Sequence, residues 1–124
     1  MTYKEIFIKL SSSKFRSSFK LNKEDIDYIN KLGFNKIKEH AYFFVKKRLA
    51  NKNIKNDGKQ TPYQGHPVFK AQHACACCCR GCLYNWYKIP KDKELTDKEI
   101  DTIVNIILLW INKEYNKYNR RSNM

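Results

Sequence analysis

Several features are scarce in this sequence, and each scarcity excludes a class of protein. No apolar run approaches the roughly 18 residues that a membrane-spanning helix needs, so we expect no membrane-spanning helix in this sequence. The first residues, MTYKEIFIKLSSSKF, hold neither a long apolar stretch nor a small-residue cleavage site, and we therefore expect no secretory signal and a cytoplasmic location. The 124 residues include only four glycines and three prolines and show no internal repeat, low-complexity tail or interdomain linker, which favours one domain over residues 1–124.

Acidic residues are also scarce. Twelve Asp and Glu oppose 25 Lys and Arg, which gives a formal net charge of +13. Such an excess predicts an anionic partner, either nucleic acid (RNA included), a nucleoprotein or an acidic protein surface. Lysine far outnumbers arginine, which favours sequence-independent phosphate contact over bidentate base readout. The alternative is that an AT-rich genome supplies many lysines that are merely solvated.

The most concentrated basic stretch runs from residue 46 to residue 59. Only Asp57 opposes the positive charge there. The residues expected to contact an anionic partner are Lys46, Lys47, Lys52, Lys55 and Lys59.

Periodicity and capping residues predict a mainly helical, all-α fold. Asn22 can cap a helix over KEDIDYINKL that ends at Gly33. A second helix is expected from about residue 35 to residue 50, where apolar residues recur every three or four positions. The clearest pattern follows Thr96, which forms a capping box with Glu99 ahead of a long apolar stripe. The first ten residues are ambiguous between helix and strand.

The middle of the chain divides into a long loop and a Cys/His-rich core. Residues 51–67 contain Gly, Pro and Asn without periodicity, and loops of this length are often functional. Residues 68–87 are expected to form two helical parts, 68–76 and 78–87, with Gly81 as a weak point. The loop sequence NDGKQTP offers amides, a lysine and a hydroxyl for a phosphate, but a simple turn is the preferred interpretation.

Cysteine is absent except in the stretch AQHACACCCRGCLYNW, where all five cysteines lie between residues 75 and 82. In a reducing compartment such a cluster favours metal ligands or buried thiols over disulfides. Zinc takes four thiolate or imidazole ligands, and on a helix the three- and four-residue spacings would put two sulfurs on one face. The candidate zinc ligands are Cys79, Cys82, His73, His66 and His40, together with Cys78.

Two other interpretations of the cysteines stay open. Small residues such as Ala, Cys and Gly suit a close helix crossing, and reduced cysteine is among the most buried residue types. Redox or nucleophilic chemistry is the second of these interpretations, because Arg80 lies inside the Cys-x-x-Cys pair and a nearby cation lowers the pKa of a thiol. Hydrolytic chemistry lacks support, since no pair of carboxylates lies near the histidines in the sequence.

The run NDGKQTPYQGHPVFKAQHACACCCRGCLYNW resembles the core of an uncharacterised bacterial and phage family, the domain of unknown function 4186. The segments FRSSFKL, HAYFFVKKRLA and IVNIILLWI extend the resemblance over nearly the whole chain. The family pattern usually has threonine at Cys75 and Cys77 and often histidine at Tyr87, which argues against a required ligand role for these residues. The resemblance favours a Cys/His site over packing alone, and the positions that match it are Cys78, Cys79, Cys82, His40, His66 and His73.

These patterns together predict a small basic binding module, stabilised by zinc, that engages nucleic acid or a nucleoprotein and is not primarily an enzyme. Size, charge and the family's occurrence in phages suggest a narrower instance, an inhibitor of a host RNA-guided (CRISPR-type) defence complex. The alternative is a metal- or thiol-dependent enzyme that acts on a nucleotide or another phosphorylated small molecule through the loop 58–66 with His73 and Cys79. A purely structural interaction protein is the third hypothesis.

Overall fold

Residues 2–123 are described by a computed structural model, and they form helices and loops without a strand. The seven helices of this part of the chain are α1 (Tyr3–Ser11), α2 (Lys14–Ser17), α3 (Lys23–Leu32), α4 (Phe34–Arg48), α5 (Pro67–Ala74), α6 (Arg80–Tyr87) and α7 (Asp97–Ser122). The prediction of a mainly helical, all-α protein is thereby confirmed. None of these helices combines the length and apolar character that crossing a membrane requires.

Local side-chain caps explain where α3 and α7 begin. The Asn22 side chain accepts a hydrogen bond from the amide of Asp25, and the Asp25 carboxylate accepts one from the amide of Asn22, both at 2.9 Å. Thr96 and Glu99 form the same reciprocal pair at the start of α7. Gly33 ends α3 with a φ of +86°, a conformation that side chains with a Cβ rarely adopt. The predicted start and end of α3 and the predicted start of α7 are therefore confirmed.

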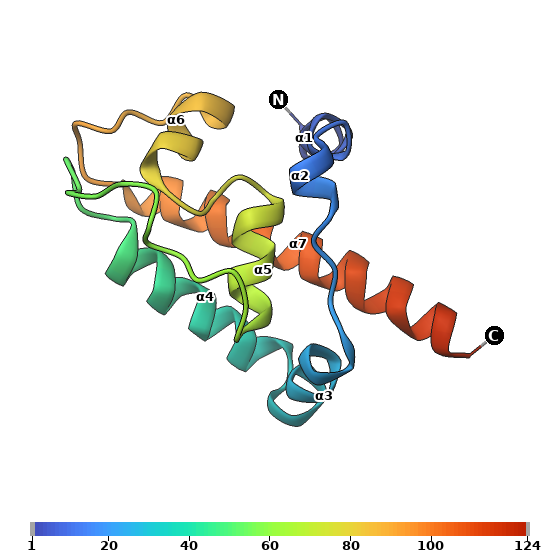
Figure 1. The fold of residues 1–124 in the computed structure, drawn as a ribbon. Coiled ribbons are helices and arrows are strands. Elements are labelled where there is room, and N and C mark those ends of the chain that lie inside the picture. The colour runs from blue at the N-terminus through green and yellow to red at the C-terminus, as the bar shows by residue number, and fades with distance from the viewer. Residues whose placement is uncertain (1, 124) are drawn as a thin grey trace.

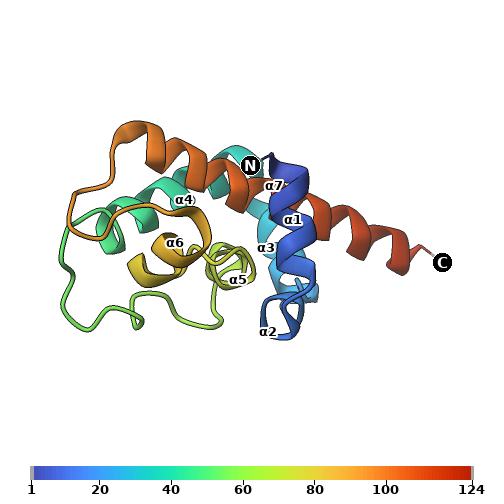
Figure 2. The same cartoon turned by 90° about the horizontal axis from the view of Figure 1, so that it is seen from above.

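The hydrophobic core lies where α4 and α5 pack against α7 (Figure 1). The stripe predicted on α4 is fully buried at Ile37, Ala41, Val45 and Leu49. The facing stripe of α7 is buried at Ile100, Ile103, Val104, Ile107 and Ile111. Seen from above, α1 crosses α7, and the last turns of α7 project beyond the other helices in both views (Figure 2).

The N-terminal segment, which the sequence leaves ambiguous, is helical. Thr2 caps α1 by accepting a hydrogen bond from the Glu5 amide at 3.1 Å, and α1 buries Ile6 and Leu10. The single turn α2 follows and packs against α5. This contact brings Arg16, on α2, to the C-terminal end of α5, where it donates a hydrogen bond to the His73 carbonyl.

The break inside the Cys/His-rich core covers residues 75–79, so it includes the predicted break at residue 77 but is wider, and Gly81 is not the weak point that the sequence predicted. Helix α5 ends at Ala74, the φ of Ala76 is +57°, and α6 begins only at Arg80. Gly81 lies inside the first turn of α6, where a Cβ would stand 3.1 Å from a carboxylate oxygen of Asp57. The glycine therefore permits a close approach of the long loop and does not interrupt the helix.

Candidate metal centre

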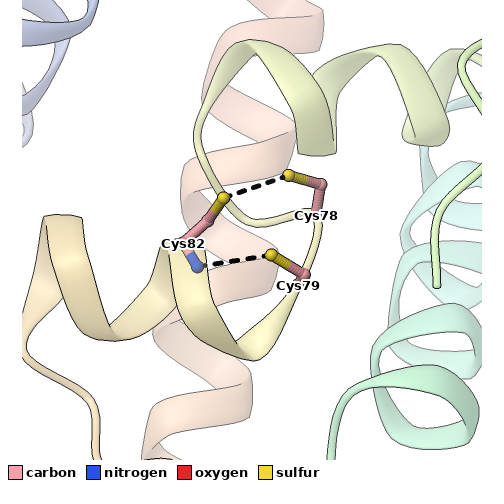
Figure 3. Close-up of side chains that lie close together, drawn as sticks. All are labelled: Cys78, Cys79 and Cys82. Atoms are coloured by element: carbon pink, nitrogen blue, oxygen red, sulfur yellow. Dashed lines mark hydrogen bonds between the residues drawn. The ribbon is translucent and has the colours of Figure 1, made fainter. Parts of the chain in front are cut away.

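Three of the five cysteines converge at the start of α6. The Sγ atoms of Cys78, Cys79 and Cys82 all lie within 4.8 Å of one another, and no other such group of ligand atoms is found in residues 2–123. The Sγ atoms of Cys78 and Cys82 are 3.6 Å apart, and the amide of Cys82 donates to Cys79 Sγ at 3.3 Å (Figure 3). This cluster, the cysteine cluster below, can hold a metal ion.

The sulfurs meet because of a turn, and not because they share one face of a helix as the spacing predicted. Cys79 is the N-cap of α6, with an extended φ of −157°, and Cys82 follows in the first helical turn. Cys79 Sγ accepts the amide hydrogen that a Ser or Asp side chain accepts at other helix starts. Cys78 precedes the cap, and its sulfur reaches Cys82 from outside the helix.

Arg16 is the member of the site that sequence reasoning missed. Its guanidinium donates to Cys78 Sγ at 3.5 Å and to Cys82 Sγ at 3.2 Å, and it is anchored on the His73 carbonyl at 2.7 Å. Burial acts to lower the pKa of Arg16, but the hydrogen bonds and charges of the two thiols outweigh it and the net shift is upward. No spacing rule connects Arg16 with a cysteine 66 positions later, so the sequence offered no signal for this contact.

The thiols of the cysteine cluster oppose one another's ionisation. Hydrogen bonds and repulsion among the three sulfurs, together with burial, place the pKa of each thiol above its ordinary value, although Arg16 acts in the opposite direction at Cys78 and Cys82. A bound divalent cation would remove this repulsion, because metal binding deprotonates thiols and neutralises their charge. The donor set of three thiolates is one that zinc and other soft cations prefer.

Cys75 and Cys77 lie apart from the cysteine cluster and belong to the core. Both are 0% exposed, and Cys75 Sγ points to the Ile106 carbonyl of α7 at 4.0 Å. Burial raises the pKa of both thiols above the ordinary value. The packing interpretation therefore describes these two cysteines, in agreement with the resemblance, which gave them no ligand role.

His40 and His66 form a pair at the other end of α5, and the structure does not bring them into the cysteine cluster. The amide of Val68 donates to His66 Nδ1 at 3.0 Å, so His66 carries its proton on Nε2 and donates to His40 Nδ1 at 3.0 Å. Burial, and then electrostatic repulsion from the neighbouring His40 ring, lower the pKa of His66 to about 4. His66 is thus a neutral N-cap of α5.

His73 is also engaged away from the sulfurs. Its Nε2 is 2.9 Å from the Thr61 carbonyl, to which it donates. The ring lies nearly parallel to two aromatic rings, those of Tyr63 and Phe19. The side chain is 4% exposed, and burial lowers its pKa. The structure therefore brings together the three predicted cysteines and leaves the three predicted histidines in other contacts.

Arg80 has a different role from the thiol activation considered for it. Arg80 is 1% exposed, and its guanidinium donates to backbone carbonyls on both sides of the cysteine-rich segment. The accepting carbonyls belong to Leu49, Asn51, Pro90 and Lys93. Arg80 thus ties the end of α4 to the segment that follows α6, and Arg16 is the cation that faces the sulfurs.

Asp57, in the long loop, accepts hydrogen bonds from the first amides of α6. Its carboxylate accepts the amide hydrogens of Arg80 and Gly81 at 2.9 and 2.8 Å, at the N-terminus of α6. Burial acts to raise the pKa of Asp57, but hydrogen bonds from Gln60 and from these two amides, with the charge of Lys91, lower it overall. Residues 55–58 form a turn, as the preferred interpretation of NDGKQTP held.

The predicted basic stretch lies at the surface. Within residues 2–123, no carboxylate lies within 4.0 Å of any of its five lysines, which are all exposed: Lys46, Lys47, Lys52, Lys55 and Lys59. On α4, Lys46 lies over the ring of Tyr42 at 5.5 Å and Lys47 over that of Phe43 at 5.3 Å. Cations and aromatic rings therefore stand side by side on the exposed face of α4.

Comparison with known proteins identifies a family but no solved relative. The family model described as "Domain of unknown function (DUF4186)" matches residues 4–112. The match spans the described helices from α1 to most of α7 and includes the cysteine cluster and Arg16. No solved structure matches the chain.

Proposed function

Because the chain belongs to the DUF4186 family, whose description states no activity, we propose its function from its own residues. The protein is a small basic binding module that engages nucleic acid or a nucleoprotein, and the cysteine cluster holds a zinc ion that stabilises it. The observation that carries the binding proposal is the uncompensated positive charge of the surface. The observation that carries the zinc proposal is the convergence of three thiols beside a guanidinium.

Uncompensated charge supports an anionic partner. Only five of the 25 Lys and Arg side chains form ion pairs in residues 2–123. Lysines without a nearby carboxylate are free to neutralise phosphates and release the cations condensed on a nucleic acid, which gives the strong salt dependence of nucleic-acid binding. The exposed Phe43 beside Lys47 adds an apolar ring to this charge, as is common at surfaces that bind nucleic acid.

The test is a titration of labelled single- and double-stranded DNA and RNA across a salt series. Affinity should fall with added salt by about one power of salt concentration for each phosphate neutralised. The triple variant Lys47→Glu, Lys52→Glu, Lys55→Glu should bind more weakly and with a shallower salt slope. A control with the same change in net charge, at exposed sites remote in the sequence, is Lys4→Glu, Lys98→Glu, Arg121→Glu. Absence of binding by the native protein at low salt contradicts direct nucleic-acid recognition.

The zinc proposal rests on the chemistry of the donor set. Cys78, Cys79 and Cys82 would be the ligands, and zinc would supply a structural cross-link between α6 and the turn that precedes it. Three thiolates and one Zn²⁺ leave a net negative charge, which the guanidinium of Arg16 would balance. The three histidines are not assigned as ligands, because none of them joins the group of converging ligand atoms and each ring forms a hydrogen bond elsewhere.

Elemental analysis of protein purified without a histidine tag tests this site. We expect about one equivalent of zinc, lost in Cys82→Ser and retained in Cys75→Ser, which removes a thiol outside the cluster. Chelation should lower the melting temperature, because a ligand at 100 times its Kd contributes about 2.7 kcal/mol to stability. A metal-free protein that melts at the same temperature with and without added zinc would contradict the proposal.

The enzyme alternative has one supporting observation, which is that the cysteine cluster supplies three ligands. Catalytic zinc sites typically take three protein ligands and keep the fourth position for water or substrate. A metal-dependent enzyme acting on a nucleotide would lose turnover in Cys82→Ser but keep it in the lysine triple variant.

The narrower hypothesis of an inhibitor of an RNA-guided defence complex is tested by measuring target cleavage by such a complex with and without the protein.

A further inference from the structure

A stack of three aromatic rings stands next to the cysteine cluster. The ring of Tyr63 lies 4.3 Å from that of His73, with 11° between their planes. On the same histidine, Phe19 stacks at 5.5 Å and 12°. The rings come from the long loop, from α5 and from the segment between α2 and α3. We call Phe19, His73 and Tyr63 the aromatic stack.

In the aromatic stack, the rings of His73 and Phe19 are held by further contacts, and the ring of Tyr63 is exposed. His73 is 4% exposed and donates to the Thr61 carbonyl, which sets the plane of its ring. Phe15 packs edge-on against Phe19 at 5.2 Å. Tyr63 is 63% exposed, although its ring is held parallel to a buried one. An aromatic ring held in place with so much of its surface in water offers a preformed position for another flat ring, at little cost in side-chain entropy.

A basic cavity borders the same stack. It measures about 120 Å³, and Phe19 and Arg16 contribute to its wall. Its other charged and hydroxyl-bearing lining residues are Lys20, Lys113, Lys117, Glu114, Ser11 and Ser17. Positive groups outnumber the one carboxylate, and Glu114 is itself paired with Lys117 at 3.6 Å. Phosphate is the anion that this combination of cations and hydroxyls would accept.

We propose that the aromatic stack and the basic cavity bind single-stranded nucleic acid. A base stacks on the outer face of Tyr63, and the phosphates of the strand run past Phe19 to the cations of the cavity. Duplexes are excluded from the stacking contact because their base faces are already covered by neighbouring bases, whereas an unpaired strand offers a free face at every base. The inference rests on the proposed nucleic-acid function and narrows its ligand to single strands.

The experiment uses fluorescein-labelled oligothymidylate of about twelve nucleotides and a duplex of the same length, each titrated with the full-length protein at low salt. Tyr63→Ala should weaken single-strand binding by about tenfold and leave duplex binding within about twofold. Tyr63→Trp keeps a flat ring and should restore the native affinity. Tyr84→Ala is the matched control, since Tyr84 is 49% exposed and forms no aromatic pair among residues 2–123.

The outcomes separate this inference from the function on which it rests. If the native protein binds neither probe, the nucleic-acid function itself fails. If the native protein binds both probes, the lysine triple variant weakens both, and Tyr63→Ala behaves like Tyr84→Ala, only the stacking site is overturned. Circular dichroism of each variant establishes that the loop substitution leaves the helices intact, and Tyr63→Trp reports on stacking even if Tyr63→Ala is unstable.

Discussion

Two arginines near the cysteines have different surroundings and therefore different roles. Arg16 is half-buried and directs its guanidinium at two sulfurs and one carbonyl. Arg80 is fully buried and directs its guanidinium at carbonyls alone. A guanidinium suits both places because it carries several donors in a fixed plane and keeps its charge when buried. The Arg16 guanidinium donates hydrogen bonds to the thiols, and the Arg80 guanidinium donates to backbone carbonyls of two chain segments.

Replacing Arg80 should destabilise the fold strongly. Arg80→Ala leaves carbonyls of Leu49, Asn51 and Pro90 without their donor and opens a cavity, and we expect a loss of about 3 kcal/mol or more in the free energy of unfolding. Arg80→Lys should lose less, since one ammonium reaches only part of the same set. Urea unfolding measures both. Arg120→Ala, at an exposed site on α7, should change stability by less than about 0.5 kcal/mol, and an equal effect at the two sites would contradict the role of Arg80.

At the scale of the element, two helices begin at unusual caps. Helix α5 starts at His66, whose Nδ1 accepts the amide hydrogen of Val68, and Pro67 follows at the first helical position. Helix α6 starts at Cys79, and the carboxylate of Asp57 reaches its first amides from the long loop. Both caps are side chains that also belong to a cluster of functional interest. A change in protonation or metal binding at Cys79 would therefore alter the cap of α6, and protonation of His66 would alter the cap of α5.

Stability should fall as the pH is lowered from about 6.5 to about 4. The pKa of His66 is about 4 in the folded protein and near 6.5 in the unfolded chain, so the unfolded state binds more protons between these values and stability rises with pH across that window. The loss amounts to about 3 kcal/mol for the full shift. His66→Asn keeps a capping acceptor but cannot titrate, so it should flatten the dependence. Urea unfolding from pH 4 to pH 7 measures this, and equal slopes for the two proteins would refute it.

The sequence predicts those parts of the fold that depend on near neighbours. Asn22 with Asp25 and Thr96 with Glu99 are three residues apart, so their caps are visible as patterns. The stripe of α4 is visible for the same reason, since its period is that of the helix. The role of Gly81 is not visible, because it depends on the close approach of Asp57, which lies in a distant part of the chain.

The sequence predicts the candidate site only in part, because it reveals residues that are close along the chain and not contacts between distant segments. Cys78, Cys79 and Cys82 are close in sequence, and a turn suffices to join their sulfurs. The histidines are predicted at the site by residue type alone, yet each ring forms a hydrogen bond with the backbone or with another histidine, which spacing does not reveal. Arg16 was missed because only the packing of α2 on α5 brings it to the thiols.

At the scale of the whole molecule, positive charge is the dominant property. The net charge is +13, and most of the cations have no acidic partner in the described residues. Self-repulsion of this kind destabilises the compact state and is relieved by salt or by an anionic partner. The same charge that attracts a partner therefore limits the stability of the free protein.

Salt should accordingly stabilise the free protein. Raising sodium chloride from about 0.02 to about 0.5 M shortens the Debye length several-fold, and we expect the melting temperature to rise by a few degrees. The variant with Lys47, Lys52 and Lys55 replaced by Glu starts from a lower net charge, so it should melt higher than the native protein at low salt and respond less to added salt. Melting curves by circular dichroism in chloride, which avoids multivalent anions, provide the measurement. A melting temperature that falls with salt would contradict this account.

The contact of Asp57 with the start of α6 has a consequence for hydrogen exchange. The amides of Arg80 and Gly81 are protected by a carboxylate from a loop more than 20 positions earlier, and not by the helix that they begin. Each opening of the loop around residue 57 would expose these two amides to deuterium while the rest of α6 stays closed. Their exchange rates therefore report the lifetime of the loop's attachment, and a ligand that settles on Tyr63 of the same loop would slow exchange at a helix that it does not touch.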